Sequence, residues 1–243
     1  GDGGTAMSIL IQNGRVIDPA NGVDEVTSLY IEDDRIVAVG DAAAVFVAVE
    51  TIDASSQWVI PGLVDLGARL REPGQEHKGT IASETRAAAS AGITSIACLP
   101  NTDPAIDSPA AVDFVCQQAE DAGYAEVHVI GAMTQGLEGK ALSEMAALKK
   151  MGCVGVSQQL TAGNDLQVLR NAMDYAASQG LTVYFHPEAY SLAEGGCAHE
   201  GAIATRMGLK SIPEAAETAA LGVLIALVEQ TGARTHFCRL STA

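Results

Sequence analysis

The clearest pattern in the chain runs from residue 93 to residue 132, with the sequence ITSIACLPNTDPAIDSPAAVDFVCQQAEDAGYAEVHVIGA. It begins with a strand-like run over residues 93–99, continues with a helical stretch over residues 109–122 and ends with a second strand over residues 126–132. A strand, a helix and another strand in this order form a βαβ unit, whose two strands lie parallel in one sheet. We therefore predict an α/β fold built on a parallel sheet.

The same alternation continues on both sides of this unit. A strand within residues 58–65 and a helix over residues 81–91 precede it. The segments that follow it alternate between helices and strands, at residues 142–151, 153–157, 166–178, 181–186, 213–231 and 234–240. A complete (β/α)₈ barrel takes roughly 250 residues, more than residues 59–243 provide. We expect an incomplete barrel of six visible strands, with an open six-stranded sheet as the alternative.

Residues 7–58 have a different pattern, made of short strands and turns. The strand-like run that begins at Ile9 meets Asn13-Gly14, a dipeptide typical of turns, before the next run begins at Arg15. We predict a small β domain over residues 7–58 and a barrel domain over residues 59–243. Residues 1–6 lack the basic and apolar segments of a signal peptide and are expected to be a cloning remnant ahead of Met7.

The composition favours a globular cytoplasmic protein and excludes several classes of partner. The chain of 243 residues is 48% hydrophobic and carries a formal net charge of −16. That acidity argues against binding to nucleic acid and to anionic membrane surfaces. The longest apolar run, residues 219–228, has roughly half the length of a membrane span. The five cysteines form no CxxC pair, so a reducing compartment fits better than a disulfide framework or a zinc clip.

Three motifs follow the first, second and sixth predicted strands of the barrel. They read PGLVDLGARLREPG at residues 61–74, LPNTDPAID at residues 99–107 and HFCRLST at residues 236–242. In this order they resemble the motifs of the dihydroorotase family of cyclic amidohydrolases, within the amidohydrolase superfamily. The resemblance implies a βα barrel with its site on the loops at the carboxyl ends of the strands. It also implies one or two divalent metals, usually zinc, that activate water to hydrolyse a cyclic amide.

The resemblance places most of the family's metal ligands on residues unsuited to that role. Gly67 and Arg69 stand where the family has the two histidines of H-x-H, and Arg239 stands where it has the histidine before x-S-T. Gln158 and Gln159 replace a pair of aspartates at the end of the fourth strand. Glycine offers no ligand and a guanidinium has no usable lone pair. An arginine about 4 Å from one positive charge costs on the order of 4 kcal/mol at an effective dielectric near 20.

His186, after the fifth strand, is the one ligand-type residue that the resemblance leaves in place. Taken alone, it is interpreted as a hydrogen-bonded structural histidine. The family's last ligand, an aspartate at the eighth strand, would lie beyond Ala243. We therefore expect a degenerate metal site without a cofactor, and zinc only if an active alternative holds.

The substrate side of the motifs is better preserved. Arg71 and Asn101 match the family residues that hold the substrate carboxylate, so they are predicted as a vestigial substrate-binding pair. Two interpretations remain for the arginines at positions 69, 71 and 239. Either they line a vestigial anion pocket, or Arg69 and Arg239 fill the vacated metal volume and pair with carboxylates. The candidate carboxylates are Asp65, Asp103 and Glu188.

Within the family, this pattern resembles the catalytically silent dihydroorotase-like subunits that accompany aspartate transcarbamoylase in some bacteria. The resemblance implies a non-catalytic structural subunit of pyrimidine biosynthesis, a pseudoenzyme that forms an oligomer with the transcarbamoylase. An active dihydroorotase, or another cyclic amidohydrolase using one metal or none, is the alternative. A small-molecule sensor that keeps an anion pocket is a third hypothesis.

Overall fold

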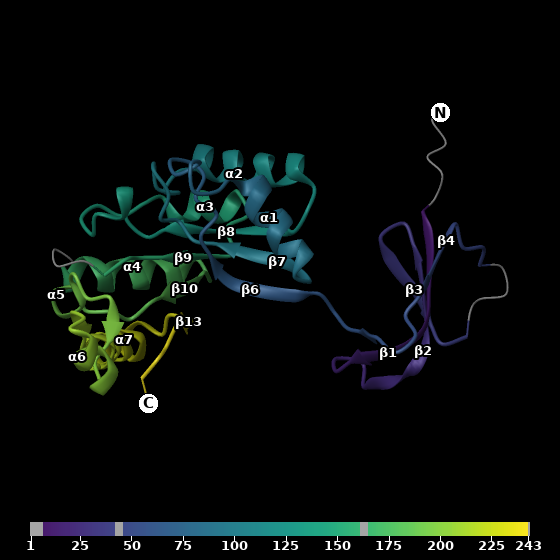
Figure 1. Ribbon diagram of the computed structural model, residues 1–243. Helices are drawn as coiled ribbons and strands as arrows, with labels where there is room; N and C mark the ends of the chain where they lie inside the picture. Colours follow the sequence, from purple (N-terminus) through teal and green to yellow (C-terminus); the bar gives the residue numbers. More distant parts are fainter. Residues whose placement is uncertain (1–6, 42–45, 161–164, 243) are drawn as a thin grey trace. The chain divides into compact units, whose positions relative to one another are not determined.

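The chain divides into two compact units, Gly1–Gly62 and Leu63–Ala243. The computed structural model is drawn in Figure 1. Residues 1–6, expected to be a cloning remnant, lie outside the described part of the chain. The structure describes residues 7–41, 46–160 and 165–242.

The N-terminal unit contains a five-stranded sheet with the order β3-β2-β1-β4, and β5 also pairs with β1. Strand β1 runs antiparallel to β2 and parallel to β4 and β5, while β2 and β3 are antiparallel. The predicted small β domain is present. Its strands are β1 (Ser8–Asp18), β2 (Val23–Glu32), β3 (Arg35–Val39), β4 (Glu50–Asp53) and β5 (Trp58–Val59).

The turn predicted at Asn13-Gly14 is wrong, because β1 continues through these residues. The pairing with β2 shifts register between Ile11 and Gly14, which marks an irregularity of the β-bulge type. Asn13 has a φ of 66°, a left-handed conformation that asparagine tolerates better than most residues. A Cβ on Gly14 would lie 2.7 Å from Cγ2 of Val59, so glycine permits the close approach of β5.

The second unit contains a six-stranded sheet with the order β13-β10-β9-β8-β7-β6. Every neighbouring pair in this sheet is parallel. The sheet curls into an incomplete barrel, which confirms the predicted α/β class and the six strands. The strands are β6 (Leu63–Ala68), β7 (Ile93–Cys98), β8 (Glu126–Ala132), β9 (Gly155–Ser157), β10 (Thr182–Phe185) and β13 (Thr235–Phe237).

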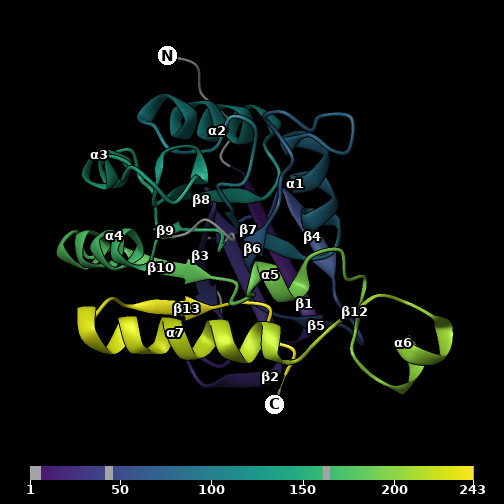
Figure 2. The same cartoon turned by 90° about the vertical axis from the view of Figure 1, so that its left-hand side faces the viewer.

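Helices cover the outer face of this sheet, each between two successive strands. Figure 2 shows α2, α3, α4 and α7 following one another around the curved sheet. The helices of this layer are α1 (Ile81–Ser90), α2 (Pro109–Ala122), α3 (Met145–Lys150), α4 (Leu166–Ser178) and α7 (Ala215–Thr231). No helix in the described part of the chain has both the length and the apolar character needed to span a bilayer.

Short elements that the sequence patterns did not predict lie in two connections. The loop after β8 contains a 3₁₀ turn, η1 (Gln135–Leu137). Between β10 and α7, a longer excursion carries two short helices and a two-stranded parallel ribbon. Its elements are α5 (Tyr190–Ala193), β11 (Ala198–His199), α6 (Ala202–Met207) and β12 (Ser211–Ile212).

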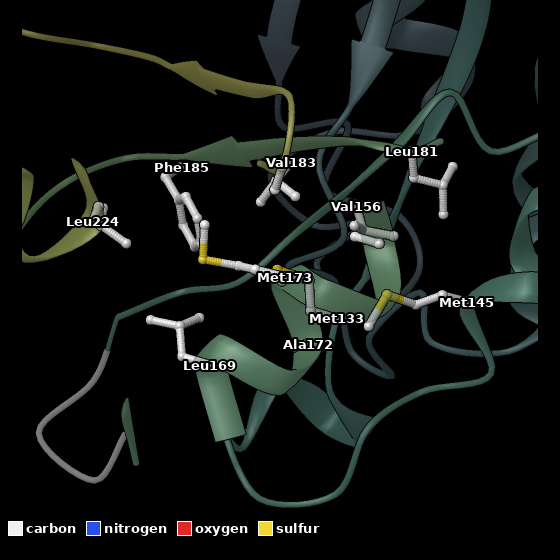
Figure 3. Close-up of a cluster of buried hydrophobic side chains, with 12 residues drawn as sticks. Met133, Met145, Val156, Leu169, Ala172, Met173, Leu181, Val183, Phe185 and Leu224 are labelled. Carbon is white, nitrogen blue, oxygen red and sulfur yellow. The ribbon is translucent and has the colours of Figure 1, made fainter. Parts of the chain in front are cut away.

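The core of the second unit lies between the sheet and its helices. One cluster joins Leu169 and Met173 of α4 to Val183 and Phe185 of β10 and to Leu224 of α7. Figure 3 shows these side chains converging from the helices and the strand. Burying each large apolar side chain contributes about 1.5–3 kcal/mol. The packed layer holds the strands in fixed register, and so fixes where the loops at their carboxyl ends begin.

Candidate functional site

The predicted site residues lie at the carboxyl ends of neighbouring parallel strands. Arg69 follows β6, Gln158 and Gln159 follow β9, His186 follows β10, and Arg239 follows β13 by two residues. Because parallel strands all end at one edge of the sheet, these positions gather at the same end of the incomplete barrel. The ends of the strands therefore bring together residues that are up to 170 positions apart in the sequence.

Most of these residues line one pocket with a volume of about 130 Å³. Glu188 and Tyr190 line it as well, on the loop that follows His186. Gly67 and Arg71 are not among the lining residues. The predicted residues that do line the pocket are Arg69, Asn101, Gln158, Gln159, His186 and Arg239.

The side-chain amide of Gln158 is buried and bound on both sides by the loop after β8. Its Oε1 accepts a hydrogen bond from the Thr134 hydroxyl at 2.7 Å, and its Nε2 donates to the Leu137 carbonyl at 2.9 Å. The same hydroxyl accepts from the Gly139 amide at 3.0 Å. An ionised carboxylate could not donate to the Leu137 carbonyl. A glutamine amide thus fits this position as a cross-link between two loops.

Gly67, which the resemblance aligns with a histidine of the family, has open space around it. A Cβ at this position would have Cδ1 of Leu99 as its nearest neighbour, at 3.9 Å. The Gly67 amide donates to Asp65 Oδ1 at 2.9 Å, which occupies one oxygen of that carboxylate. Sterically, therefore, the backbone does not demand glycine here.

Arg69 and Arg239 have no carboxylate oxygen within 4.0 Å among the described residues. The predicted pairing of these arginines with Asp65, Asp103 or Glu188 is therefore wrong. Partial desolvation, followed by the charges of Arg239 and Arg71, lowers the pKa of Arg69, and the Glu188 carboxylate offsets part of that effect. The arginines approach each other closely enough to repel.

His186 is half-buried beside these charges. Desolvation and the positive charge of Arg239 lower the pKa of its imidazole, with a smaller effect of the same sign from Arg69. The carboxylates of Glu188 and Glu217 act in the opposite direction and raise it. On balance the pKa of His186 is lowered, which favours the neutral imidazole.

The structure separates the two residues predicted to hold a substrate carboxylate. Asn101 lines the pocket, whereas half-buried Arg71 has a φ of 67° and donates to Gln75 Oε1 at 3.3 Å. Its neighbour Glu72 accepts the Ile81 amide at 2.7 Å and so caps the first turn of α1. Part of the REPG motif therefore anchors a helix.

Glu217 is a residue at this end of the sheet that the motifs do not identify. Its carboxylate accepts from the amide and hydroxyl of Ser241, at 2.9 and 3.0 Å, and from the amide of Thr242 at 2.9 Å. It also accepts from the Thr242 hydroxyl. These hydrogen bonds lower the pKa of Glu217 to about 2. Glu217 thereby holds the Ser-Thr pair that follows Arg239.

The donor set at these positions does not fit the metals that the resemblance implies. Zinc sites use three or four protein ligands that have free lone pairs. The imidazole of His186 has a free lone pair, whereas the guanidinium groups of Arg69 and Arg239 have none. The side chain of Gln158 is already engaged, because it accepts a hydrogen bond from Thr134 and donates one to Leu137. Among the described residues, no group of three or more His, Cys, Asp or Glu could hold a metal ion.

Comparison with protein families gives one match, over residues 56–243, to the family described as dihydro-orotase-like. The chain is 48% identical over 237 residues to dihydroorotase-like proteins of Pseudomonas putida and Pseudomonas aeruginosa, covering 98% of this chain and 56% of each relative. It is 43% identical over 236 residues to a dihydroorotase of Syntrophotalea carbinolica, covering 97% and 55%. The chain thus spans a little more than half the length of these relatives.

Solved structures with the same fold include hydantoinases. The L-hydantoinase (dihydropyrimidinase) of Arthrobacter aurescens superimposes with a TM-score of 0.74 at 20% identity, covering 93% of this chain and 51% of that one. A D-hydantoinase gives a TM-score of 0.70 at 25% identity, covering 95% and 51%. At such identities the likeness to the Arthrobacter enzyme shows the fold alone.

Proposed function

Because the chain belongs to the dihydroorotase-like family of amidohydrolases, we propose that it is a member without metal-dependent hydrolysis, a pseudoenzyme with a structural role. The observation that carries this proposal is the set of residues at five ligand positions of the family. None of them is a histidine or a carboxylate. They are Gly67, Arg69, Gln158, Gln159 and Arg239.

The geometry around these positions supports the proposal. Arg69 and Arg239 line the same pocket as His186, so any metal bound through His186 would face two guanidinium charges. At about 4 Å and an effective dielectric near 20, each unit of like charge costs on the order of 4 kcal/mol. For a metal ion of charge +2, the repulsion from each arginine is twice this value. Even a carboxylate ligand contributed beyond Ala243 would bring the ligands to two.

Catalysis in the family relies on metals that make water a nucleophile at neutral pH. With those ligands replaced, the described residues that line the pocket do not supply the ligand set that such a metal needs. The imidazole of His186 has a lowered pKa through desolvation and the charge of Arg239, and so is a weaker base than an ordinary histidine. The proposal therefore assigns the pocket no hydrolytic step.

The test is a dihydroorotate hydrolysis assay on the full protein, with and without added zinc. We expect no turnover above the uncatalysed background under either condition. Turnover at ordinary enzyme rates, roughly 1–10³ s⁻¹, would contradict the proposal. An active dihydroorotase assayed in parallel controls for the reagents.

The structural role that we propose is assembly with the catalytic subunit of aspartate transcarbamoylase in pyrimidine biosynthesis. Support comes from the resemblance carried by the altered motifs around Gly67 and Arg239. Co-purification of the two full proteins, followed by size-exclusion chromatography, tests it. We expect one complex that elutes ahead of either component. Two separate peaks at micromolar concentrations would contradict the proposed assembly with this partner. The conclusion from the hydrolysis assay would stand unchanged.

A cyclic amidohydrolase with one metal or none is the second candidate. The observation that favours it is that Asn101 and His186 line one pocket. If this candidate is correct, replacing Arg71 or His186 with alanine abolishes hydrolysis of a cyclic amide. An unchanged rate in both variants would eliminate it.

A further inference from the structure

The pocket at the carboxyl ends of the strands has an excess of positive charge in an otherwise acidic protein. Arg69 and Arg239 line it, and Glu188 is the single carboxylate among its described lining residues. The chain has 30 acidic residues and 14 basic ones. Even so, no described carboxylate oxygen lies within 4.0 Å of Arg69 or Arg239. Neither guanidinium group therefore forms a direct ion pair with a described carboxylate.

The two guanidinium groups interact unfavourably as they stand. The charges of Arg239 and Arg71 lower the pKa of Arg69, which means that they disfavour its protonated form. An anion between the guanidinium groups would reverse that effect, because a nearby negative charge favours the protonated form of arginine. The planar donor fork of arginine matches the two oxygens of a carboxylate.

The size and lining of the pocket limit the anion. A volume of about 130 Å³ is close to the roughly 150 Å³ cavity that holds one benzene molecule. The apolar side chains of Leu99, Leu137 and Leu160 also line the pocket, so the ligand has an apolar part. Asn101 lines the same space, and its side chain forms no hydrogen bond with a described residue. An organic acid with a short hydrocarbon spacer satisfies these conditions better than an inorganic anion does.

We propose that this pocket binds a small organic dicarboxylate, with Arg69 and Arg239 each contacting a carboxylate and Asn101 donating a further hydrogen bond. This binding rests on the proposed function. A metal centre at the same positions would occupy the space between the arginines and would itself bind the anion. The residues that replace the metal ligands would then serve recognition without hydrolysis.

The experiment is calorimetric titration of the full protein with malonate, backed by the change in melting temperature at saturating ligand. Malonamide, which has the same skeleton without charge, and inorganic phosphate are the comparison probes. We expect saturable malonate binding, weaker binding of phosphate and none of malonamide. Neither heat nor a rise in melting temperature at malonate concentrations up to roughly 10 mM would overturn the proposal. So would equal binding of malonate and malonamide, or tighter binding of phosphate.

Three variants test the assignment to residues. Arg239→Gln and Arg69→Gln are each expected to weaken malonate binding about tenfold or more. Arg86→Gln, on the exposed side of α1, removes the same charge away from the pocket and should leave binding unchanged. Circular dichroism identifies any variant that fails to fold. If one arginine variant is unfolded, the malonate affinity of the other one tests the proposal. Unchanged affinity in a folded Arg69→Gln or Arg239→Gln variant would overturn the proposal.

Zinc content and dihydroorotate hydrolysis, measured on the same preparation, keep this inference distinct from the proposed function. Stoichiometric zinc with turnover would overturn the proposed function, whatever the malonate result. A metal-free, inactive protein that does not bind malonate would overturn the dicarboxylate site alone.

Discussion

At the scale of single residues, Gln158 shows how a buried amide can connect two loops. Its amide joins the loop after β9 to the loop after β8, through Thr134 on one side and Leu137 on the other. Glutamine supplies an N–H group whose hydrogen bond the Leu137 carbonyl accepts, which an ionised carboxylate could not do. The family resemblance predicts that a carboxylate is replaced at this position. It does not indicate the new partners, which lie 21 and 24 residues away.

Gln158→Glu is predicted to destabilise the protein. The change removes the donor to Leu137 and sets a carboxylate against a carbonyl oxygen in a buried position, at a cost of about 1–3 kcal/mol. Urea unfolding of the variant and the parent protein measures the difference. Gln118→Glu, the same change on the partly exposed side of α2, is the control and should alter stability much less. Equal stabilities of the parent and Gln158→Glu would show that the cross-link contributes nothing.

Glu217 gives the fold a dependence on pH. Its hydrogen bonds with Ser241 and Thr242 lower its pKa from 4.5 to about 2. A lowered carboxyl pKa stabilises the folded state fully above pH 4.5, and the contribution is lost as the pH falls towards 2. We expect Glu217→Gln to reduce the free energy of unfolding at pH 7 by about 1–3 kcal/mol. The variant should also lose less stability than the parent between pH 4.5 and pH 2.

Urea unfolding at several pH values compares these proteins, with Glu214→Gln at the same end of α7 as the control. Parallel pH profiles for the parent and the Glu217 variant would contradict the assigned role. The Ser-Thr pair is visible in the sequence as part of a motif. The carboxylate that holds it precedes it by 24 residues on a helix, and no spacing rule joins the two.

At the scale of elements, long periodic segments could be predicted and short ones could not. The predicted bounds of α2, β8 and α4 agree with the structure, because each is a continuous periodic run with clear ends. Helix α3 is shorter than predicted, and Leu142 instead forms a bridge with Thr134. The elements within residues 190–212 contain two to six residues each, too few to establish a period.

The predicted strand over residues 58–65 is in fact two strands. Strand β5 pairs with β1 in the N-terminal sheet, and β6 begins at Leu63 in the parallel sheet. Pro61-Gly62 separates them, which is consistent with the tendency of these residues to interrupt a strand. An apolar run alone does not indicate which sheet each half of the run joins.

The contact between β9 and β10 gives a prediction at this scale. A Cβ on Gly155 would lie 2.5 Å from the Thr182 carbonyl oxygen, which is backbone and cannot rotate away. Gly155→Ala should therefore force the two strands apart and destabilise the protein by about 1–3 kcal/mol. Gly222→Ala, on α7 with nothing within 4 Å, should instead stabilise it by about 0.5–1 kcal/mol. Thermal unfolding measures both, and a neutral Gly155→Ala would contradict the close packing.

At the scale of the whole molecule, the fold could be predicted because it depends on alternation and not on the site. The order of strands and helices predicts a parallel barrel sheet, and hydantoinases at 20–25% identity share the fold. The site depends on a few loop residues. Their identities can change while the sheet and its helices keep the same arrangement. The motifs, through their resemblance to the family, predict which ligand positions are altered. They could not indicate that Arg69 and Arg239 line one pocket in which no described carboxylate oxygen lies within 4.0 Å of either.

The central claim is that the positions of the family's metal ligands do not bind a metal in this protein. The most direct measurement is the zinc content of the full protein after incubation with zinc and desalting, alongside a His186→Ala variant. The account predicts far less than one zinc per chain and no difference between the two proteins. One or two zinc ions per chain, lost on replacement of His186, would contradict it.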